Sequence, residues 1–348
     1  MAGAMPSREV AKHARDLLGT LIAENGGYVP GRETDLVSEM VGTCVKLLRD
    51  RASLSDIRIL STALKELRYA FKVFSHYRGV RKVSTFGSAR IRTNDATYRL
   101  ARDFAREIAK ANFMIITGAG GGVMRACQEG AGRERSFGVN IRLPFEQQAN
   151  EFIERDAKLM TFKYFFTRKI LFIKEADAIV LFPGGFGTHD EAYEALTLVQ
   201  TGKTTPMPIV FLDIPRGTYW KTWQRYVTDH LLRRRLISKD DLSLFRVTDD
   251  IDEAVHELTT FYRVYHSIRV VGRKTVIRIT RRISEDLLMR LNAEFADILQ
   301  GGRITQGLAL PVEVSEQDTA HLPRLVMDFN RTGFGRLRQM IDVLNREG

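Results

Sequence analysis

The chain has 348 residues, of which 44% are hydrophobic, and a formal net charge of +11, so it is long enough for about two domains. No apolar run approaches the roughly 20 residues of a membrane span, and residues 1–15 lack the apolar core of a secretion signal. Cys44 and Cys127 lie far apart in helical patterns, so we expect neither a disulfide nor a metal pair. These features predict a cytoplasmic enzyme or binding protein that does not associate with membranes.

The first 80 residues show the apolar periodicity of helices. Ser7 is a candidate cap for a first helix, a second helix runs through Leu36 to Leu48, and Ser55 is a candidate cap for a third. A breaker cluster at residues 26–31 separates the first two. We expect residues 1–80 to form an α-helical lead-in that packs on the main domain.

From Val83 onward, apolar strands alternate with amphipathic helices. Predicted strands cover residues 82–86, 113–117, 137–141, 158–162, 178–182 and 209–212. Predicted helices cover 96–111, a segment from 123, 164–176, 188–201, 219–232, 238–242 and 251–262. Because fully apolar strands alternating with helices are typical of a parallel sheet covered on both faces, residues 81–264 predict a Rossmann-like, doubly wound α/β domain.

Residues 265–348 change character and predict a small separate α+β module. A strand over 270–280 is interrupted at Gly272, and an amphipathic helix over 284–299 begins with Ser284 as its cap. Strands at 307–310 and 324–329 and a helix over 335–344 complete a β-α-β-β-α pattern.

Part of the positive charge is clustered, which leaves two interpretations open. The clusters are Arg233-Arg234-Arg235 and the set Arg273, Lys274, Arg278, Arg281 and Arg282. One interpretation is binding of nucleic acid or of an anionic effector, and the other is a solvated basic face. Since no nucleic-acid-binding motif accompanies the charge, we expect no nucleic-acid partner.

Three glycine-rich turns each follow a predicted strand. They are Gly87-Ser88, Gly118 to Gly122, and Gly184-Gly185-Phe186-Gly187-Thr188. In a doubly wound sheet, ligands bind beyond the carboxyl ends of the strands, so the three turns can converge on one site. Glycine lets backbone N–H groups approach an anion, and helix N-termini add partial positive charge. The turns therefore predict a phosphate-binding site, in which Thr188 caps its helix or donates its hydroxyl to phosphate.

Two common nucleotide signatures are missing from these turns. The segment Gly118 to Val123 lacks the third glycine of G-x-G-x-x-G, and no acid at the end of the next strand is placed to bind a ribose. The P-loop signature G-x-x-x-x-G-K-[ST] is also missing. A dinucleotide site and triphosphate hydrolysis by a P-loop are therefore disfavoured.

The stretch Pro183 to Glu191 resembles the P-G-G-x-G-T-x-x-E signature of the LONELY GUY family, once labelled "lysine decarboxylase-like". Arg168-Lys169 is similar to the second half of its M-x-x-R-K element, with Phe165 in place of the methionine. Residues 120–124 and 87–90 resemble its other two loops, and the long bacterial members are the best match. The resemblance implies hydrolysis of the N-glycosidic bond of a nucleoside 5′-monophosphate, such as AMP or a cytokinin riboside monophosphate.

The resemblance implies catalytic roles for Arg168 and Glu191. Breaking an N-glycosidic bond develops positive charge at the anomeric carbon, so Glu191 is expected to stabilise that charge and orient water. Arg168 is expected to bind phosphate, to hold Glu191, or to assist the departing base. The expected substrate-binding residues are Gly87, Ser88, Gly121, Gly122, Met124, Lys169, Gly184, Gly185, Gly187 and Thr188.

We expect no metal and no other cofactor, because the seven histidines are scattered and no lysine has a pyridoxal phosphate context. The resemblance to the LONELY GUY family also implies the expected partners. They are a nucleoside monophosphate as substrate and a second copy of the chain, in a homodimer or higher homo-oligomer. A non-catalytic nucleotide sensor and a nucleic-acid-binding Rossmann-like protein remain alternative functions.

Overall fold

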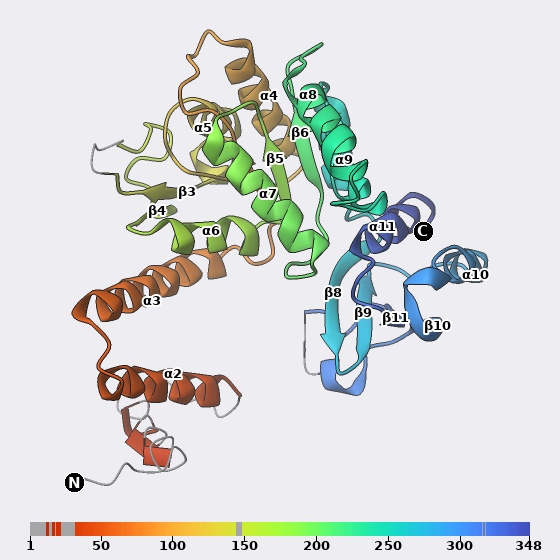
Figure 1. Ribbon diagram of the computed structural model, residues 1–348, viewed down its shortest axis with the longest axis horizontal. Coiled ribbons are helices and arrows are strands. Elements are labelled where there is room, and N and C mark those ends of the chain that lie inside the picture. The colour runs from red at the N-terminus through yellow and green to blue at the C-terminus, as the bar shows by residue number, and fades with distance from the viewer. Residues whose placement is uncertain are drawn as a thin grey trace. The chain divides into compact units, whose positions relative to one another are not determined.

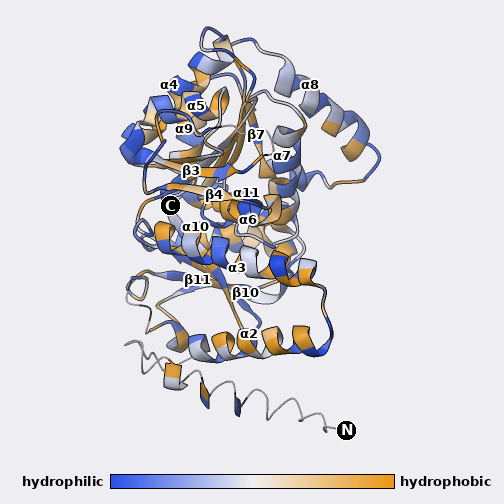
Figure 2. Cartoon of the chain, turned by 90° about the vertical axis from the view of Figure 1, so that its left-hand side faces the viewer, coloured by the Kyte–Doolittle hydropathy of each residue, from blue (hydrophilic) through white to orange (hydrophobic). Residues whose placement is uncertain are grey.

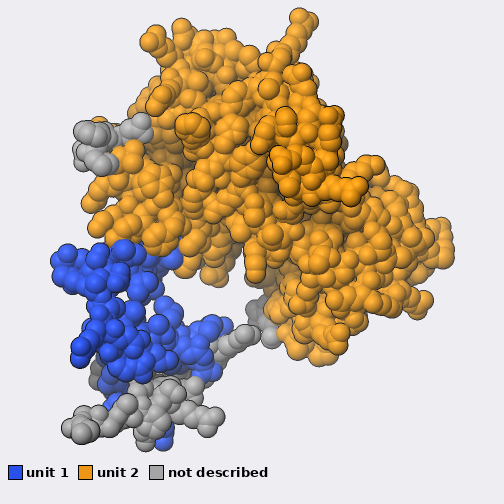
Figure 3. All heavy atoms as spheres, in the orientation of Figure 1, with its two compact units in different colours: residues 1–68 blue, residues 69–348 orange. Residues whose placement is uncertain are grey.

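The computed structural model describes residues 12–13, 16–17, 19–21, 32–143, 148–314, 316 and 318–348. The chain divides into two compact units, residues 1–68 and residues 69–348, shown in different colours in Figure 3. The predicted cap at Ser7 and the breaker cluster at 26–31 lie outside the described residues. Within the described part of the chain, no helix is both long and apolar enough to span a membrane.

The described part of the lead-in includes two long helices. Helix α2 (Arg32–Arg49) alternates apolar and polar residues along its length (Figure 2), and its Leu48 is 71% exposed. Helix α3 (Leu54–Ser75) begins before Ser55, so the predicted cap is wrong. Ser53 is the cap instead: its Oγ accepts a hydrogen bond from Asp56 N at 3.2 Å, and Ser53 N donates to the Asp56 carboxylate.

A seven-stranded, all-parallel sheet forms the main domain, as the apolar runs predict. Its strands are β1 (Lys82–Phe86), β2 (Met114–Thr117), β3 (Ser136–Ile141), β4 (Leu159–Phe162), β5 (Ala178–Leu181), β6 (Ile209–Leu212) and β7 (Arg246–Thr248). The spatial order is β4-β3-β2-β1-β5-β6-β7. The order reverses between β1 and β5, and in doubly wound sheets this switch point is where ligands bind.

Helices cover both faces of this sheet. They are α4 (Ala96–Lys110), α5 (Val123–Ala131), α6 (Phe165–Lys174), α7 (Phe186–Gln200), α8 (Tyr219–Tyr226) and α9 (Ile251–Thr260). Apolar residues of α4, α5 and α9 pack on one face together with Val83 and Val180. On the other face, Phe172 of α6 packs edge-on against Phe86, and Trp223 of α8 stacks on Phe211. Because side chains alternate along a strand, each strand supplies both cores.

The C-terminal residues form a four-stranded antiparallel sheet with the order β10-β11-β9-β8 (Figure 1). Its elements are β8 (Tyr265–Val271), β9 (Lys274–Ile279), α10 (Glu285–Glu294), β10 (Leu299–Gly307), β11 (Arg324–Phe329) and α11 (Phe334–Glu347). Leu291 of α10 and Leu337 of α11 are fully buried in its apolar core. We refer to residues 265–348 as the C-terminal module.

Three strand predictions are corrected by the structure. The predicted strand over 270–280 is a hairpin of two strands, in which Gly272 takes φ +59° at the turn, where glycine is favoured. The predicted strand at 307–310 ends at Gly307 and belongs to β10. Strand β7 was not predicted, because three residues are too few to show a strand pattern and the strand is defined by its pairing with β6. Because the hairpin at Gly272 counts as two strands, the order of elements in the C-terminal module is β-β-α-β-β-α.

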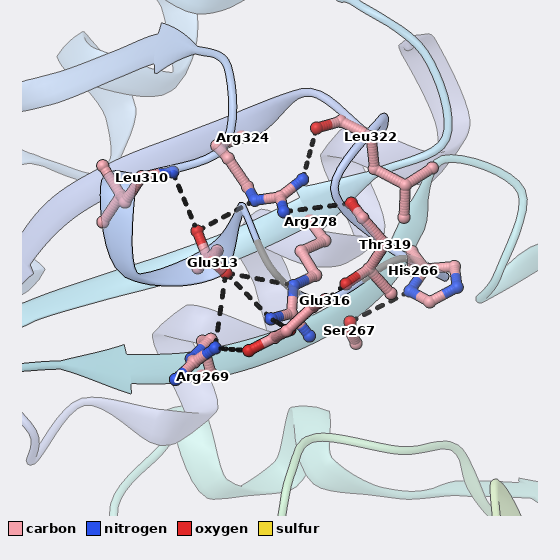
Figure 4. A network of polar contacts seen from close by, with 10 residues as sticks. All are labelled: His266, Ser267, Arg269, Arg278, Leu310, Glu313, Glu316, Thr319, Leu322 and Arg324. Carbon is pink, nitrogen blue, oxygen red and sulfur yellow. Dashed lines mark hydrogen bonds and ion pairs between the residues drawn. The ribbon is translucent and has the colours of Figure 1, made fainter.

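A buried network of ion pairs ties the module together (Figure 4). Arg324 and Glu313 have fully buried side chains, and Arg324 Nε donates to Glu313 at 3.1 Å. The other two nitrogens of Arg324 donate to backbone carbonyls of Leu322 and Thr319. Arg278 donates to both Glu313 and Glu316. Part of the basic cluster predicted from the sequence is thus engaged inside the fold.

Candidate active site

The three glycine turns meet at the switch point between β1 and β5, as predicted. Ser88 joins them: its N–H donates to Pro183 O at 3.1 Å, and its carbonyl accepts from Val123 N at 3.0 Å. Gly122 has φ +61°, and a Cβ placed there would lie 2.2 Å from Ser88 O. Only glycine fits this close approach of two backbones. Backbone contacts between turns that lie far apart in the sequence therefore bring the site together.

Two helix N-termini open onto these turns. Helix α5 begins after Gly122 and α7 begins after Gly185, and neither has a side-chain cap. Thr188 is therefore not the cap of α7, because the helix starts at Phe186 and places Thr188 in its first turn. The N-terminal N–H groups of a helix attract anions, most strongly when no side chain occupies them.

Glu191 lies one turn into α7 and is 5% exposed. Its Oε2 is 3.2 Å from Lys169 Nζ but makes no hydrogen bond, so the contact is an ion pair without hydrogen-bond geometry. Burial raises the pKa of Glu191, and the charge of Lys169 offsets part of that increase. A buried carboxylate whose ionised form is costly is typical of functional sites.

Lys169 of α6 contacts three carboxylates. Its Nζ lies 2.8 Å from Asp190, 2.6 Å from Glu194 and 3.2 Å from Glu191. Burial would lower the pKa of Lys169, but hydrogen bonds to Asp190 and Glu194 outweigh it and raise the pKa. The negative charge of Glu194 also raises the pKa of Glu191. We therefore infer that Lys169 positions the carboxylate of Glu191.

Arg168 precedes Lys169 on α6 and points to the glycine turns. Its guanidinium carbon is 4.9 Å from the centre of the Phe165 ring, and its Nη1 is 3.6 Å from the position a Cβ would take at Gly118. Burial lowers the pKa of Arg168, and the charge of Glu191 opposes that shift. Its Nε is buried and has no hydrogen-bond partner.

Tyr219, at the start of α8, is a site residue that the sequence did not reveal. Its hydroxyl donates to Gly184 O and lies 2.7 Å from His189 Nε2. Burial lowers the pKa of His189, which favours the neutral ring. Tyr219 therefore fixes the glycine turn from an element some 30 residues further along the chain.

These residues surround an open pocket of about 830 Å³, which we call the glycine-loop pocket. Its volume is within the range of small-molecule sites. The predicted residues that line it are Gly87, Ser88, Met124, Arg168, Gly184, Gly185, Gly187, Thr188 and Glu191. Gly121, Gly122 and Lys169 lie behind this lining. Phe165 also lines the pocket, whereas Phe162 is buried in β4.

The chemistry available in the pocket is that of anion binding and charge stabilisation. In the described part of the chain, no group of three or more His, Cys, Asp or Glu side chains is arranged to hold a metal ion. The pocket combines a half-buried guanidinium, whose Nε is buried, with a buried carboxylate and two uncapped helix N-termini. This set can bind a phosphate ester and stabilise positive charge on a sugar.

Solved structures with a similar fold cover about half of the chain. An X-ray structure of TM1055 is 22% identical and matches 51% of this chain and 96% of its own, with a TM-score of 0.37. The molybdenum cofactor carrier protein of Chlamydomonas reinhardtii is 17% identical over 51% and 94%, with a TM-score of 0.37. DNA processing protein A from Helicobacter pylori is 17% identical over 53% and 81%, with a TM-score of 0.36.

None of the curated proteins matches the chain. One family does: residues 121–258 match the family described as "Possible lysine decarboxylase". The match includes Arg168, Lys169 and the whole stretch from Pro183 to Glu191. It therefore covers the two main motifs on which the resemblance to the LONELY GUY family rests, but not the loop at residues 87–90. The chain carries a domain of this family, built on the Rossmann-like sheet described above.

Proposed function

We propose that the protein hydrolyses the N-glycosidic bond of a nucleoside 5′-monophosphate to a free base and ribose 5-phosphate. One observation carries the proposal: Arg168 Nε and Glu191 Oε2 are both buried and lack a hydrogen-bond partner. They belong to residues that line one pocket together with the glycine turns. Leaving such groups unpaired costs about 1–3 kcal/mol each, so their retention supports a role with a ligand.

The glycine turns are the proposed phosphate anchor. Phosphate would accept hydrogen bonds from N–H groups at the start of α7 and from the Thr188 hydroxyl, which lines the pocket. The partial positive charge at a helix N-terminus favours a phosphate dianion there. Glu191 follows one turn further into the same helix, so the ribose of a bound monophosphate extends from the anchor toward its carboxylate.

In the proposed reaction, the bond between C1′ and the base nitrogen breaks and the electron pair leaves with the base. A water oxygen forms the new bond to C1′, and the proton that the water loses balances the one that the base gains. Positive charge develops on the sugar before the water bond is complete. The Glu191 carboxylate stabilises that charge and orients the water, which is an electrostatic contribution to catalysis.

The ionised form of Glu191 is the active one in this scheme. Because burial raises the pKa of Glu191, the fraction of active enzyme increases as the pH rises through that pKa. The charge of Lys169 opposes that increase in pKa and so extends the ionised form of Glu191 to lower pH. Arg168 carries a positive charge at any pH of interest and is placed to bind the substrate phosphate or the departing base.

The test is an assay of purified protein with a panel of nucleoside 5′-monophosphates, with the free base and ribose 5-phosphate measured separately. We expect equal amounts of both products from at least one monophosphate, and no cleavage of the matching nucleoside, which lacks the anchor group. Tight binding of a monophosphate without cleavage would contradict the proposal and favour a nucleotide sensor.

A further inference from the structure

A second pocket, of about 900 Å³, lies between the main domain and the C-terminal module. Helix α6 and the segment that follows α7, Thr201–Pro206, form one side, and residues of β8, β9 and the β11–α11 connection form the other. We call it the module groove. It shares no lining residue with the glycine-loop pocket. All of its residues belong to the unit formed by residues 69–348.

The lining of the module groove is strongly cationic. It contains five cationic side chains and a single carboxylate, Glu194. Lys169, Lys174 and Arg269 are paired with nearby acids. Lys203 and Arg331 are exposed, and neither enters an ion pair among the described residues. Lys203 comes from the segment after α7, and Arg331, whose Nη2 donates to Gly272 O at 3.1 Å, comes from the β11–α11 connection on the opposite side.

Hydroxyl groups add hydrogen-bonding capacity to the same lining. Thr201, Thr204 and Thr205 come from the segment after α7, and Thr275 comes from β9. Thr275 is 2% exposed, and its Oγ1 has no hydrogen-bond partner. A buried hydroxyl without a partner is rare in a folded protein and calls for a ligand or water at that position. It is an observation independent of the charge.

The rest of the groove is apolar and closely packed. Phe329 and Phe334 meet edge to face with ring centres 5.2 Å apart. Gly202 has φ +66°, and a Cβ there would lie 1.9 Å from the Phe334 ring, so this ring rests directly on backbone. Ile268 and the 53% exposed Val270 extend the apolar wall. A ligand ring could therefore bury apolar area next to the cations.

We propose that the module groove is a second ligand site, which binds a nucleotide separately from the glycine-loop pocket. The phosphates lie between Lys203 and Arg331, and the base packs on the apolar wall. Lys169 lines the module groove, and its Nζ lies 3.2 Å from Glu191 of the glycine-loop pocket. The side chain of Lys169 therefore lies between the two sites. This site goes beyond the proposed hydrolysis and does not depend on it.

The test uses ADP as the probe with the full-length chain. We expect ADP to bind with a Kd below about 1 mM, and Lys203→Glu/Arg331→Glu to weaken the binding at least about tenfold. Arg234→Glu/Arg303→Glu is the matched control: it changes the net charge equally at two exposed arginines outside both pockets, and binding should be unchanged. Equal affinity for the two double variants, or no binding by the wild type, would overturn the proposal.

Hydrogen exchange locates the bound ADP without any substitution. We expect protection in residues 201–206 and 329–334 of the wild type, beyond any protection of the glycine turns. Protection confined to residues 184–190 would place ADP in the glycine-loop pocket and contradict the second site. Pyrophosphate distinguishes a nucleotide site from a simple anion site: it should bind more weakly than ADP, and equal affinity would refute the contribution of the apolar wall.

Discussion

The glycine-loop pocket and the ion-pair network of the C-terminal module both bury arginine and glutamate, but they differ in how these groups are satisfied. In the module, Arg324 and Glu313 are fully buried, and each makes hydrogen bonds within the network. In the pocket, Arg168 Nε and Glu191 Oε2 make no hydrogen bond, although Glu191 forms an ion pair with Lys169. Buried charged groups with hydrogen bonds hold a fold together, whereas buried charged groups without them cost stability. The comparison separates a structural from a functional use of the same residue types.

The largest expected effect lies in the module. Glu313→Gln keeps the shape of the side chain but leaves Arg278 and Arg324 without their shared countercharge. We expect the free energy of unfolding to fall by about 3–5 kcal/mol, as for other broken buried pairs. Denaturant unfolding measures it, with Glu285→Gln, an exposed acid in the first turn of α10, as the control that changes stability by less than about 0.5 kcal/mol.

For Arg168 in the glycine-loop pocket we expect a loss of activity without a loss of stability. Arg168→Met keeps an apolar side chain against Phe165 and Phe172 but removes the buried charge. We expect kcat/KM for nucleoside monophosphate hydrolysis to fall by about 10²–10³, with unchanged or increased stability. Lys110→Met, at an exposed position of α4, is the control. A large loss of stability in Arg168→Met would mean that this arginine serves the fold.

Tyr219→Phe tests a hydrogen bond whose loss should have an effect of intermediate size. The substitution removes the hydrogen bond that the hydroxyl donates to Gly184 O and its contact with His189 Nε2, while the ring stays in place. A neutral hydrogen bond contributes about 0.5–1.5 kcal/mol, so we expect KM to rise about three- to tenfold with a smaller change in kcat. Tyr226→Phe, on the same helix, should leave both constants unchanged.

The smallest effect is a change in pH dependence. The charge of Lys169 lowers the pKa of Glu191 against the effect of burial, so Lys169→Met should raise that pKa further. The acidic limb of the kcat/KM profile should therefore move to higher pH, and Lys110→Met should not move it. An unshifted profile would show that Glu191 is not the group that titrates.

The sequence predicted the main sheet well, because each buried parallel strand, such as Ala178–Leu181, is a continuous apolar run. It also predicted that the glycine turns meet, since turns after parallel strands lie at one sheet edge. It missed the hairpin at Gly272 and strand β7, whose definition depends on pairing partners. Tyr219 was missed for a related reason: its role comes from a contact with Gly184, and nothing in its local sequence signals that contact.

Glu191→Gln, studied by kinetics and by binding, tests the central claim most directly. We predict that hydrolysis of the preferred monophosphate falls at least about 100-fold while its Kd stays within about tenfold. Because the wild type must ionise a buried carboxyl whose pKa is raised, its stability relative to the variant should decrease as the pH rises through that pKa. Full activity in Glu191→Gln would contradict the catalytic role of this carboxylate. It would also contradict the contrast between a functional pair in the glycine-loop pocket and a structural network in the C-terminal module.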